Sequence, residues 1–374
     1  MFLALRELRF ARWRFALMGS VVALIAVLMV LLSGLSSGLV NDGVSGLQRL
    51  PVTAFAFDEG TKLDSAFSRS VVDTQQVERW RQQPGVQAAE PFGTMLINTR
   101  SDRGVPADLA VFGVEPNSFL APTPAEGSGL GAPDGIVVSR TALDAGLRLG
   151  DTVTVDRIGT ELKVVGVTAD QRTYGHVDVA YLPLAAWQRL HAGVGPGQAL
   201  PPQAADQATA VAIRADDNVD LAAGDAAAGT SSFEKKDSYG ASPGYTAETS
   251  TLTLIRVFLY AISALVVGAF FTVWTINRRH ELAVLRAMGA AKSYLLRDGL
   301  VQALAILTAS IAVGVGVGLA LGGLMGGSGV PFALEAPAVA LAAVLLVLLG
   351  LLGASAAIVR VTTVDPLAAL GGQR

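Results

Sequence analysis

The sequence predicts a membrane α-helical protein with four transmembrane helices and an α+β extracytoplasmic domain inserted between helices 1 and 2. Composition is the first indication, because 51% of the 374 residues are hydrophobic, 16% are charged and the mean hydropathy is +0.49. Soluble domains usually carry about 25% charged residues. The second indication is a set of four long apolar runs. The third is a long segment after the first run, in which short β-branched stretches alternate with turn residues.

Each apolar run is long enough to cross a bilayer, which needs about 20 residues in a helix. The first run, residues 15–40, has no charged residue, and the second, residues 252–276, has only Arg256. The third starts at Gly299 and decays into "GGLMGGSGVPF", so its first part is the predicted span; the fourth covers residues 336–359. The first run is too long for the h-region of a cleavable signal and lacks an Ala-x-Ala site, which favours a retained anchor.

Basic residues indicate how the chain is oriented, because cytoplasmic loops carry an excess of Lys and Arg. They gather before the first run (Arg6, Arg9, Arg12, Arg14), between the second and third runs (Arg278, Arg279, Arg286, Lys292, Arg297) and after the fourth (Arg360, Arg374). The segment between the third and fourth runs has Glu335 as its only charge. Both termini are therefore predicted to be cytoplasmic, and the long inserted segment to lie outside a bacterial plasma membrane.

This orientation divides the chain into eight predicted segments. They are a cytoplasmic amphipathic start with the first transmembrane helix (1–40), the extracytoplasmic α+β domain (41–251), the second transmembrane helix (252–276), a cytoplasmic coupling helix (277–298), the third transmembrane helix (299–325), an outside loop (326–336), the fourth transmembrane helix (337–360) and a cytoplasmic tail (361–374).

The inserted segment has the patterns of a globular α+β domain. "VERWRQQPGVQAAEPF" (77–92) predicts a helix, a glycine and then a strand, and residues 136–184 contain four stretches rich in β-branched residues. "RTALDAGLRLGD" (140–151) predicts a short helix closed by glycine. We expect two lobes, with a flexible small-residue linker at "LAAGDAAAGTSS" (221–232).

The residues give no support for an enzyme. There is no cysteine, which excludes disulfides and a Cys nucleophile, and the net charge of −3 gives no basic field for nucleic acid. His176 could be a metal ligand, but a turn histidine before an edge strand is the favoured interpretation, since no Asp/Glu/His cluster has metal spacing. "MGAAKSY" (288–294) lacks the spacing of a phosphate-binding loop, so any ATPase would be a separate chain.

The charged segment "NRRHELAVLRAMGAAKSYLLRD" (277–298) interrupts the apolar runs. A partial apolar stripe at helical spacing consists of Leu282, Leu285 and Met288. Glu281 falls within that stripe and Arg286 beside it, which suits docking in a protein groove better than lying in lipid. The alternative is a plain connector whose arginines follow the positive-inside rule, and the residues alone favour neither.

The order of one span, a large outside domain and three further spans resembles the MacB/FtsX-type (type VII) ABC transporter permeases. "RRHELAVLRAMGAAKSYLL" is similar to their coupling segment, whose E-x-x-x-L-[RK]-A-[ILM]-G-A core is carried here by Glu281, Leu285, Arg286, Ala287, Met288, Gly289 and Ala290. "VTTVDPLAALGG" (361–372) is similar to the family's closing V-D-P-[LIV]-x-A-L, and "LALRELRFARWRFALM" to its amphipathic N-terminal helix. The resemblance covers the whole chain.

The resemblance implies a transport subunit without its own ATPase site. In that family two copies of a cytosolic ABC ATPase dock on a pair of permeases, so a second copy of this chain is an expected partner, besides the lipid membrane. The residues implied in ATPase coupling are Glu281, Leu285, Arg286, Met288 and Gly289. ATP binding would tilt the spans through this segment and move the outside domains, which is mechanotransmission.

Two further stretches, residues 31–50 and 242–271, resemble the HrtB-type branch, the permeases of haem exporters in Gram-positive bacteria. This resemblance implies haem as the cargo, captured from the outer leaflet, with no permanently bound cofactor. Haem is flat and apolar, so the small-residue face at Gly34 and Gly38 could offer a slot, although plain helix packing is the commoner use of such glycines.

The candidate haem-binding residues are Glu248, Tyr245 and Arg256. The carboxylate of Glu248 would be a hard oxygen ligand for haem iron, but it could equally be a helix-start residue favoured by the macrodipole. Tyr245 is a second-rank ligand or hydrogen-bond donor. Arg256 could pair with a propionate, although snorkelling to lipid phosphate is favoured.

Other functions stay open from the sequence. The same fold could export a lipid, a peptide or an antibiotic. An FtsX-like relay that activates a cell-wall hydrolase would use a protein partner outside the cell and no cargo. An adhesion or receptor protein would have no ATPase at all.

Overall fold

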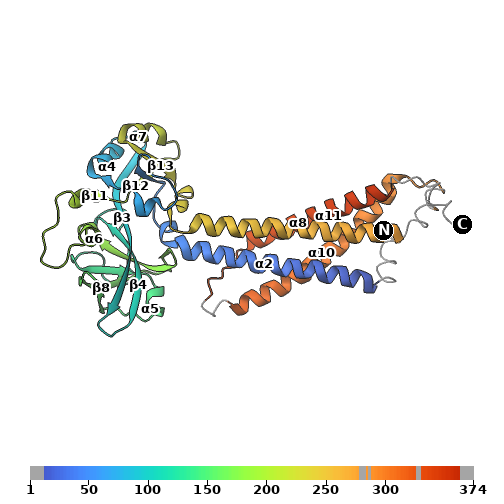
Figure 1. Cartoon of the computed structure of the whole chain (residues 1–374), viewed down its shortest axis with the longest axis horizontal. Coiled ribbons are helices and arrows are strands. Elements are labelled where there is room, and N and C mark those ends of the chain that lie inside the picture. Colours follow the sequence, from blue (N-terminus) through green and yellow to red (C-terminus); the bar gives the residue numbers. More distant parts are fainter. Residues whose placement is uncertain (1–11, 278–283, 285–287, 326–329, 363–374) are drawn as a thin grey trace. The chain divides into compact units, whose positions relative to one another are not determined.

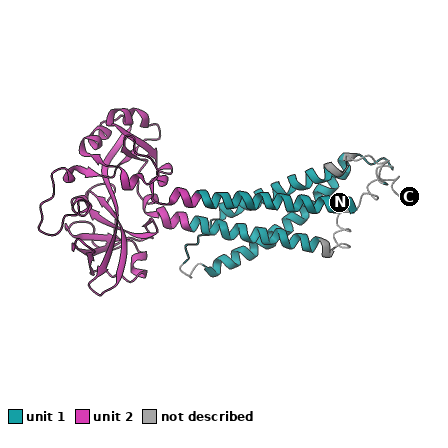
Figure 2. Ribbon diagram, viewed as in Figure 1, with its two compact units in different colours: residues 1–38, 250–374 teal, residues 39–249 magenta. Residues whose placement is uncertain are grey.

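The computed structural model of the chain describes residues 12–277, 284, 288–325 and 330–362. The first part of the predicted amphipathic start, residues 3–11, and most of the closing V-D-P segment lie outside the described residues. The chain divides into two compact units (Figure 2): a helical unit of residues 1–38 and 250–374, and an α/β unit of residues 39–249.

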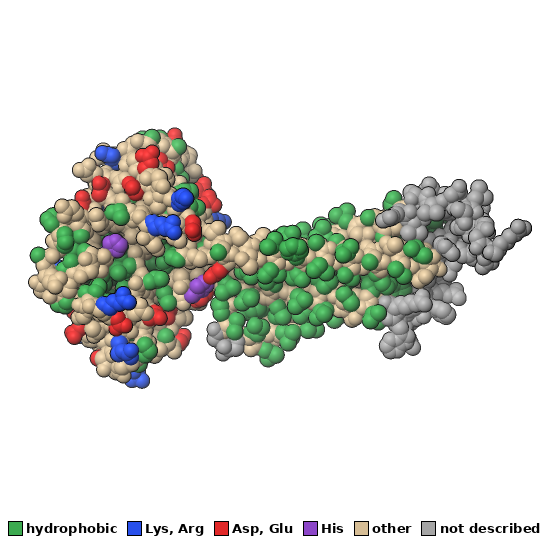
Figure 3. Space-filling model, viewed as in Figure 1, with side chains coloured by type: hydrophobic (Ala, Val, Ile, Leu, Met, Phe, Trp, Pro, Cys, Tyr) green, Lys and Arg blue, Asp and Glu red, His purple; other side chains and the backbone are tan. Residues whose placement is uncertain are grey.

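Within the described residues, four helices are long and apolar enough to cross a membrane: α2 (Arg12–Gln48), α8 (Tyr245–Asn277), α10 (Lys292–Met325) and α11 (Ala336–Thr362). Hydrophobic side chains cover the face of this unit seen in Figure 3. Leu254, Phe258 and Leu265 of α8 are each more than half exposed. Such a surface suits lipid, which solvates apolar side chains as well as a protein core does.

Close helix contacts in this unit occur at glycines. A Cβ on Gly314 of α10 would lie 2.3 Å from the carbonyl oxygen of Ala23 on α2, and one on Gly353 of α11 would lie 2.5 Å from that of Ala264 on α8. These helices can approach so closely only because the glycines have no side chain. Val267 and Phe271 fill the buried face of α8.

The charged segment after α8 is not one helix over residues 277–298. α8 ends at Asn277, Val284 is helical, Met288 and Gly289 form a turn, and α10 begins at Lys292. Gly289 has a φ of +95°, a conformation that is easily adopted by glycine and that ends a helix. The last part of the predicted coupling helix is therefore the first part of α10.

The α/β unit is built on one sheet with the strand order β13-β1-β12-β3-β4-β10-β6-β8-β5; β7 also pairs with β3 and β8, and β9 with β10. The strands of this sheet are β1 (Ala54–Asp58), β3 (Val86–Ser101), β4 (Pro106–Val114), β5 (Glu126–Gly127), β6 (Gly135–Val138), β7 (Thr152–Val155), β8 (Glu161–Val167), β9 (Thr173–Tyr174), β10 (Val177–Pro183), β12 (Ala210–Ala215) and β13 (Thr230–Glu234). A separate small sheet pairs β2 (Val72–Asp73) with β11 (Gln207–Ala208).

The short helices of the unit lie against the two halves of this sheet (Figure 1). They are α3 (Ala66–Arg69), α4 (Thr74–Arg81), α5 (Thr141–Asp144), α6 (Leu184–His191) and α7 (Leu221–Ala228), with 3₁₀ turns at Ala204–Asp206 and Asp237–Ala241. β3 joins the halves, because its first part pairs with β12 and its part from Gly93 onward pairs with β4. The two lobes expected for the α+β domain are thus the two halves of one sheet, which are connected through the long strand β3.

Local patterns predicted most of these elements. α4, Gly85 and β3 follow in the predicted order, and β6, α5, β7, β8 and β10 occupy the stretch in which strands and a short helix were expected. The prediction of a flexible linker at residues 221–232 is wrong, since this stretch forms α7 and the start of β13. Asp220 caps α7 through the backbone N–H of Ala223, and Gly229 ends it in the left-handed conformation.

Candidate functional site

The candidate site is centred on the tight turn between β9 and β10. Gly175 and His176 form this turn with φ values of +57° and +65°. Two successive positive φ values are typical of the type I′ hairpin turn, and histidine is among the non-glycine residues that adopt positive φ more often than most. The prediction of a turn histidine is correct, but the following strand is not an edge strand, because β10 lies between β4 and β6.

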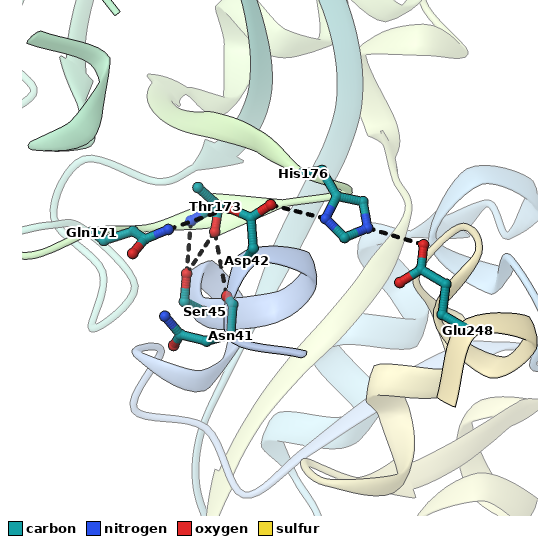
Figure 4. Close-up of polar contacts among 7 residues, drawn as sticks. All are labelled: Asn41, Asp42, Ser45, Gln171, Thr173, His176 and Glu248. Carbon is teal, nitrogen blue, oxygen red and sulfur yellow. Dashed lines mark hydrogen bonds and ion pairs between the residues drawn. The ribbon is translucent and has the colours of Figure 1, made fainter. Parts of the chain in front are cut away.

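The last turns of α2 are fixed to this hairpin by several hydrogen bonds (Figure 4). The backbone N–H of Gly175 donates to the carbonyl of Gly43 at 2.9 Å, and that of Thr173 donates to the Ser45 hydroxyl at 2.9 Å. The hydroxyls of Ser45 and Thr173 are 2.8 Å apart. Gly46 permits the close approach, because a Cβ there would lie 3.0 Å from the carbonyl of Thr173.

His176 lies between two carboxylates from different helices (Figure 4). Its Nδ1 is 2.9 Å from Oδ2 of Asp42 on α2, and its Nε2 is 3.0 Å from Oε1 of Glu248 in the first turn of α8. The other oxygen of Asp42 accepts from Gln171 at 3.3 Å. All three partners are part-exposed, with side-chain exposures of 34% for His176, 23% for Asp42 and 39% for Glu248.

The two carboxylates favour the charged form of the imidazole. Burial lowers the pKa of His176, but hydrogen bonds and charge attraction to Asp42 and Glu248 outweigh it, so the pKa is raised above its usual value. When protonated, the ring donates from both nitrogens and leaves no lone pair for a metal. Within the described residues, no group of three or more His, Cys, Asp or Glu could hold a metal ion.

The structure places the predicted cargo residues in different surroundings. Glu248 lies in the first turn of α8, where its backbone N–H donates to Gly244 at 3.0 Å, and its carboxylate contacts His176. The ring of Tyr245 packs edge-on against Tyr239, at 6.2 Å between centroids, beside the core of the α/β unit. Arg256 is half-buried, about two turns further along α8 in the helical unit.

The predicted slot at Gly34 and Gly38 is filled by the chain itself. A Cβ on Gly34 would lie 2.3 Å from the ring of Phe332, and one on Gly38 would lie 2.1 Å from the carbonyl of Pro331. The backbone N–H of Ala333 also donates to the carbonyl of Gly34 at 3.0 Å. These glycines accommodate the segment before α11, in keeping with the packing interpretation rather than with an open slot.

Among the predicted coupling residues, Met288 and Gly289 are described and form the exposed turn before α10, with Met288 72% exposed. Glu281, Leu285 and Arg286 lie outside the described residues. The sequence did not point to Asp42 as a partner, and no spacing signal could have done so, because residues 42, 176 and 248 come from three distant segments.

These features define a class of protein: an integral membrane protein of four apolar helices with an α/β domain inserted between the first two. Comparison with known proteins gives the family. Residues 253–366 match the family described as FtsX-like permease C-terminal. Residues 253–366 thus form an FtsX-like permease domain, and the four apolar helices together with relatives that are ABC transporter permeases indicate a bacterial membrane protein.

Relatives match along nearly the full length. A protein assigned as the hemin transport system permease HrtB of Staphylococcus haemolyticus is 25% identical over 372 residues, covering 99% of both chains. An uncharacterized ABC transporter permease of Mycobacterium tuberculosis is 25% identical over 381 residues, covering 100% of this chain and 99% of its own. The crystal structure of the periplasmic region of MacB from Actinobacillus actinomycetemcomitans is 13% identical with a TM-score of 0.35, covering 50% of this chain and 91% of that one.

Proposed function

We propose that this chain is the permease subunit of an ATP-driven efflux pump that exports haem from the outer leaflet of the membrane. The observation that carries the proposal is the full-length similarity to a permease whose assigned role is hemin transport. The α/β unit would lie outside the cell and both termini inside, because the basic residues of the sequence favour that orientation.

Glu248 is the proposed iron ligand. Its carboxylate is part-exposed in the first turn of α8, and a carboxylate is a hard oxygen donor that suits ferric iron. One oxygen contacts His176, so iron would compete with the imidazole for this carboxylate. Tyr245 is a weaker candidate, because its ring packs beside the core of the α/β unit. Arg256 would meet a propionate from further along the same helix.

The proposed motor is a cytosolic ABC ATPase in two copies. It would grip the segment after α8, where the exposed Met288 offers an apolar contact and Gly289 sets the direction of α10. A second copy of the permease would complete the pump. In the most hydrophobic stretch of α8, 17% of the residues are buried, against 33–39% in the corresponding stretches of the other three helices. α8 therefore has a large apolar face for a partner helix or lipid.

The test of the cargo is a haem titration of the purified full chain with its ATPase subunit, followed by absorbance near the Soret band. Glu248→Ala should weaken haem binding about 10–100-fold, the usual cost of a lost metal ligand or its support. The matched control is Glu335→Ala, an exposed carboxylate just before α11, which should bind haem normally. Equal affinity in both variants would remove Glu248 as the ligand.

The test of the motor is co-purification. Arg286→Glu should reduce the amount of ATPase subunit recovered with the permease, because it reverses a charge in the predicted docking segment. Unchanged recovery would contradict the coupling role. Intact coupling without any haem binding would favour a lipid, peptide or antibiotic as cargo, and activation of a cell-wall hydrolase without cargo-stimulated ATPase activity would favour an FtsX-like relay.

A further inference from the structure

α2 and α8 are attached to the β9–β10 hairpin in unequal ways. Backbone and side-chain bonds from Gly175, Thr173 and Gln171 hold residues 41–45 of α2. The first turn of α8 meets the hairpin through the carboxylate of Glu248 on His176. α2 is attached by several hydrogen bonds, whereas α8 is attached by a contact between two part-exposed side chains. The attachment of α8 is therefore much easier to open.

His176 is held ready for this contact from the α2 side. Asp42 binds its Nδ1 at 2.9 Å, which leaves Nε2 directed at Glu248. The fixed turn at Gly175 limits where the ring can go, since Gly175 is itself bonded to Gly43. The imidazole therefore stays with α2 and the hairpin when Glu248 leaves.

The start of α8 has the features of a pivot. Gly244, the residue before the helix, has a φ of +79°, and a Cβ there would meet nothing closer than Glu248 Oε1 at 3.6 Å. Tyr245 anchors the first residue beside the core, against Tyr239. Its backbone bond to Ser242 is long, at 3.4 Å, as is the bond of Thr246 to Gly240, at 3.5 Å. α8 can thus turn about Tyr245 while Glu248, one turn later, swings.

We propose that the His176–Glu248 contact is a releasable latch on α8, and that a ligand which takes the Glu248 carboxylate opens it. The second half of this statement rests on the proposed function, in which haem iron is that ligand. Cargo capture then has a mechanical consequence, because the start of α8 becomes free while α2 remains fixed to the hairpin. The latch itself stands on the geometry of the α/β unit alone.

Hydrogen–deuterium exchange of the full chain in lipid nanodiscs, in complex with its ATPase subunit, tests the latch. His176→Ala should raise the exchange of peptides covering residues 246–252 roughly tenfold, the effect of losing one hydrogen bond to a charged group. Exchange of residues 41–48 of α2 should stay unchanged. His191→Ala is the matched control, because it removes the same side chain from α6, elsewhere in the same unit.

Glu248→Ala removes the same contact from the other side and so distinguishes loss of the latch from a folding defect in His176→Ala. It should give the same increase as His176→Ala, and the double variant should show no further increase, because both changes remove one contact. Additive increases, or equal exchange in His176→Ala and the His191→Ala control, would overturn the latch.

Addition of haem to the unaltered protein tests whether a ligand of Glu248 opens the latch. Exchange of residues 246–252 should rise to the level of His176→Ala, while His176→Ala itself should respond little. If haem binds by absorbance and this exchange stays the same or falls, the ligand-opened latch is wrong. If haem does not bind and His176→Ala still raises exchange, the proposed cargo fails and the latch survives.

Discussion

The α/β unit and the helical unit differ in the side chains that dominate their packing. The largest buried side chains of the α/β unit are aromatic, and its main core cluster contains Phe55, Phe57, Phe67, Phe92, Phe112, Tyr174 and Tyr181, whose contacting rings have centroids 5.0–6.0 Å apart. The close contacts of the helical unit are instead at glycines, as at Gly314 and Gly353. Charged side chains are spread over the visible face of the α/β unit and are nearly absent from that of the helices (Figure 3).

The difference follows from the solvent that each unit displaces. Water rewards the burial of large apolar rings, so a domain in water gains stability from each one. Lipid gives no such reward, and helices in lipid associate through close backbone approach and dispersion. A large side chain should therefore be indispensable in the α/β unit and harmful at the contacts of the helical unit.

The largest effect is expected for Trp80→Ala in the α/β unit. Trp80 is fully buried, its indole N–H donates to Thr230 at 3.0 Å, and its ring packs on Gly224, where a Cβ would lie 2.3 Å away. Losing the ring should destabilise the unit by about 3–5 kcal/mol. Protease cleavage of the full chain within residues 39–249 measures it, with Arg79→Ala on the exposed face of the same helix as control. Equal protease resistance in the two variants would contradict the comparison.

A smaller effect is expected for Gly314→Leu in the helical unit. The new side chain would meet the Ala23 carbonyl and the Ala26 side chain of α2, so α2 and α10 must separate, at a cost of about 1–3 kcal/mol. Gly316→Leu is the control, since a Cβ there meets nothing within 4 Å. Thermal unfolding in detergent should show a lower midpoint for the first variant only, with the protease resistance of residues 39–249 unchanged in both. A loss of equal size at Gly316 would mean that helix propensity, rather than packing, dominates.

The sequence was sufficient where the deciding interactions are local. Hydropathy over about 20 residues determines a span, and alternating β-branched residues determine strands such as β7 and β8, because both patterns lie within one element. It misled at residues 221–232, where small residues suggested a linker. There the composition serves packing, since Gly224 admits Trp80 and Asp225 bonds Thr230 and Ser232.

The candidate site was only half predictable for the same reason. Glu248 could be predicted as a site residue from its place at the start of an apolar helix and from a family resemblance. Its contact with His176, and that of His176 with Asp42, depend on the long-range pairing that brings the β9–β10 hairpin to α2. No local pattern encodes that pairing, so the histidine could be identified as a turn residue but not as the link between two carboxylates.

The smallest effect is expected for Asp151→Asn, which tests how far charge pairs contribute beside the aromatic core. Arg103 donates to both oxygens of Asp151, at 2.7–3.3 Å, and the Asp151 side chain is only 8% exposed. The hydrogen bond from Arg103 lowers the pKa of Asp151, and burial opposes this only in part. A carboxylate whose pKa is lower in the folded state stabilises the fold above its unfolded pKa, and this stabilisation is lost as the pH falls through the folded value.

The unaltered chain should therefore unfold at a higher temperature than Asp151→Asn near pH 7, by roughly 2–4 °C, and the difference should shrink as the pH is lowered below about 4. Asp170→Asn is the control, because its pair with Arg49 is about half exposed on both sides and such pairs contribute little. A difference as large at pH 3 as at pH 7, or one as large in Asp170→Asn, would show that the ion pair with Arg103 is not its source. The α/β unit would then depend on its buried rings even more completely than its contrast with the helical unit already requires.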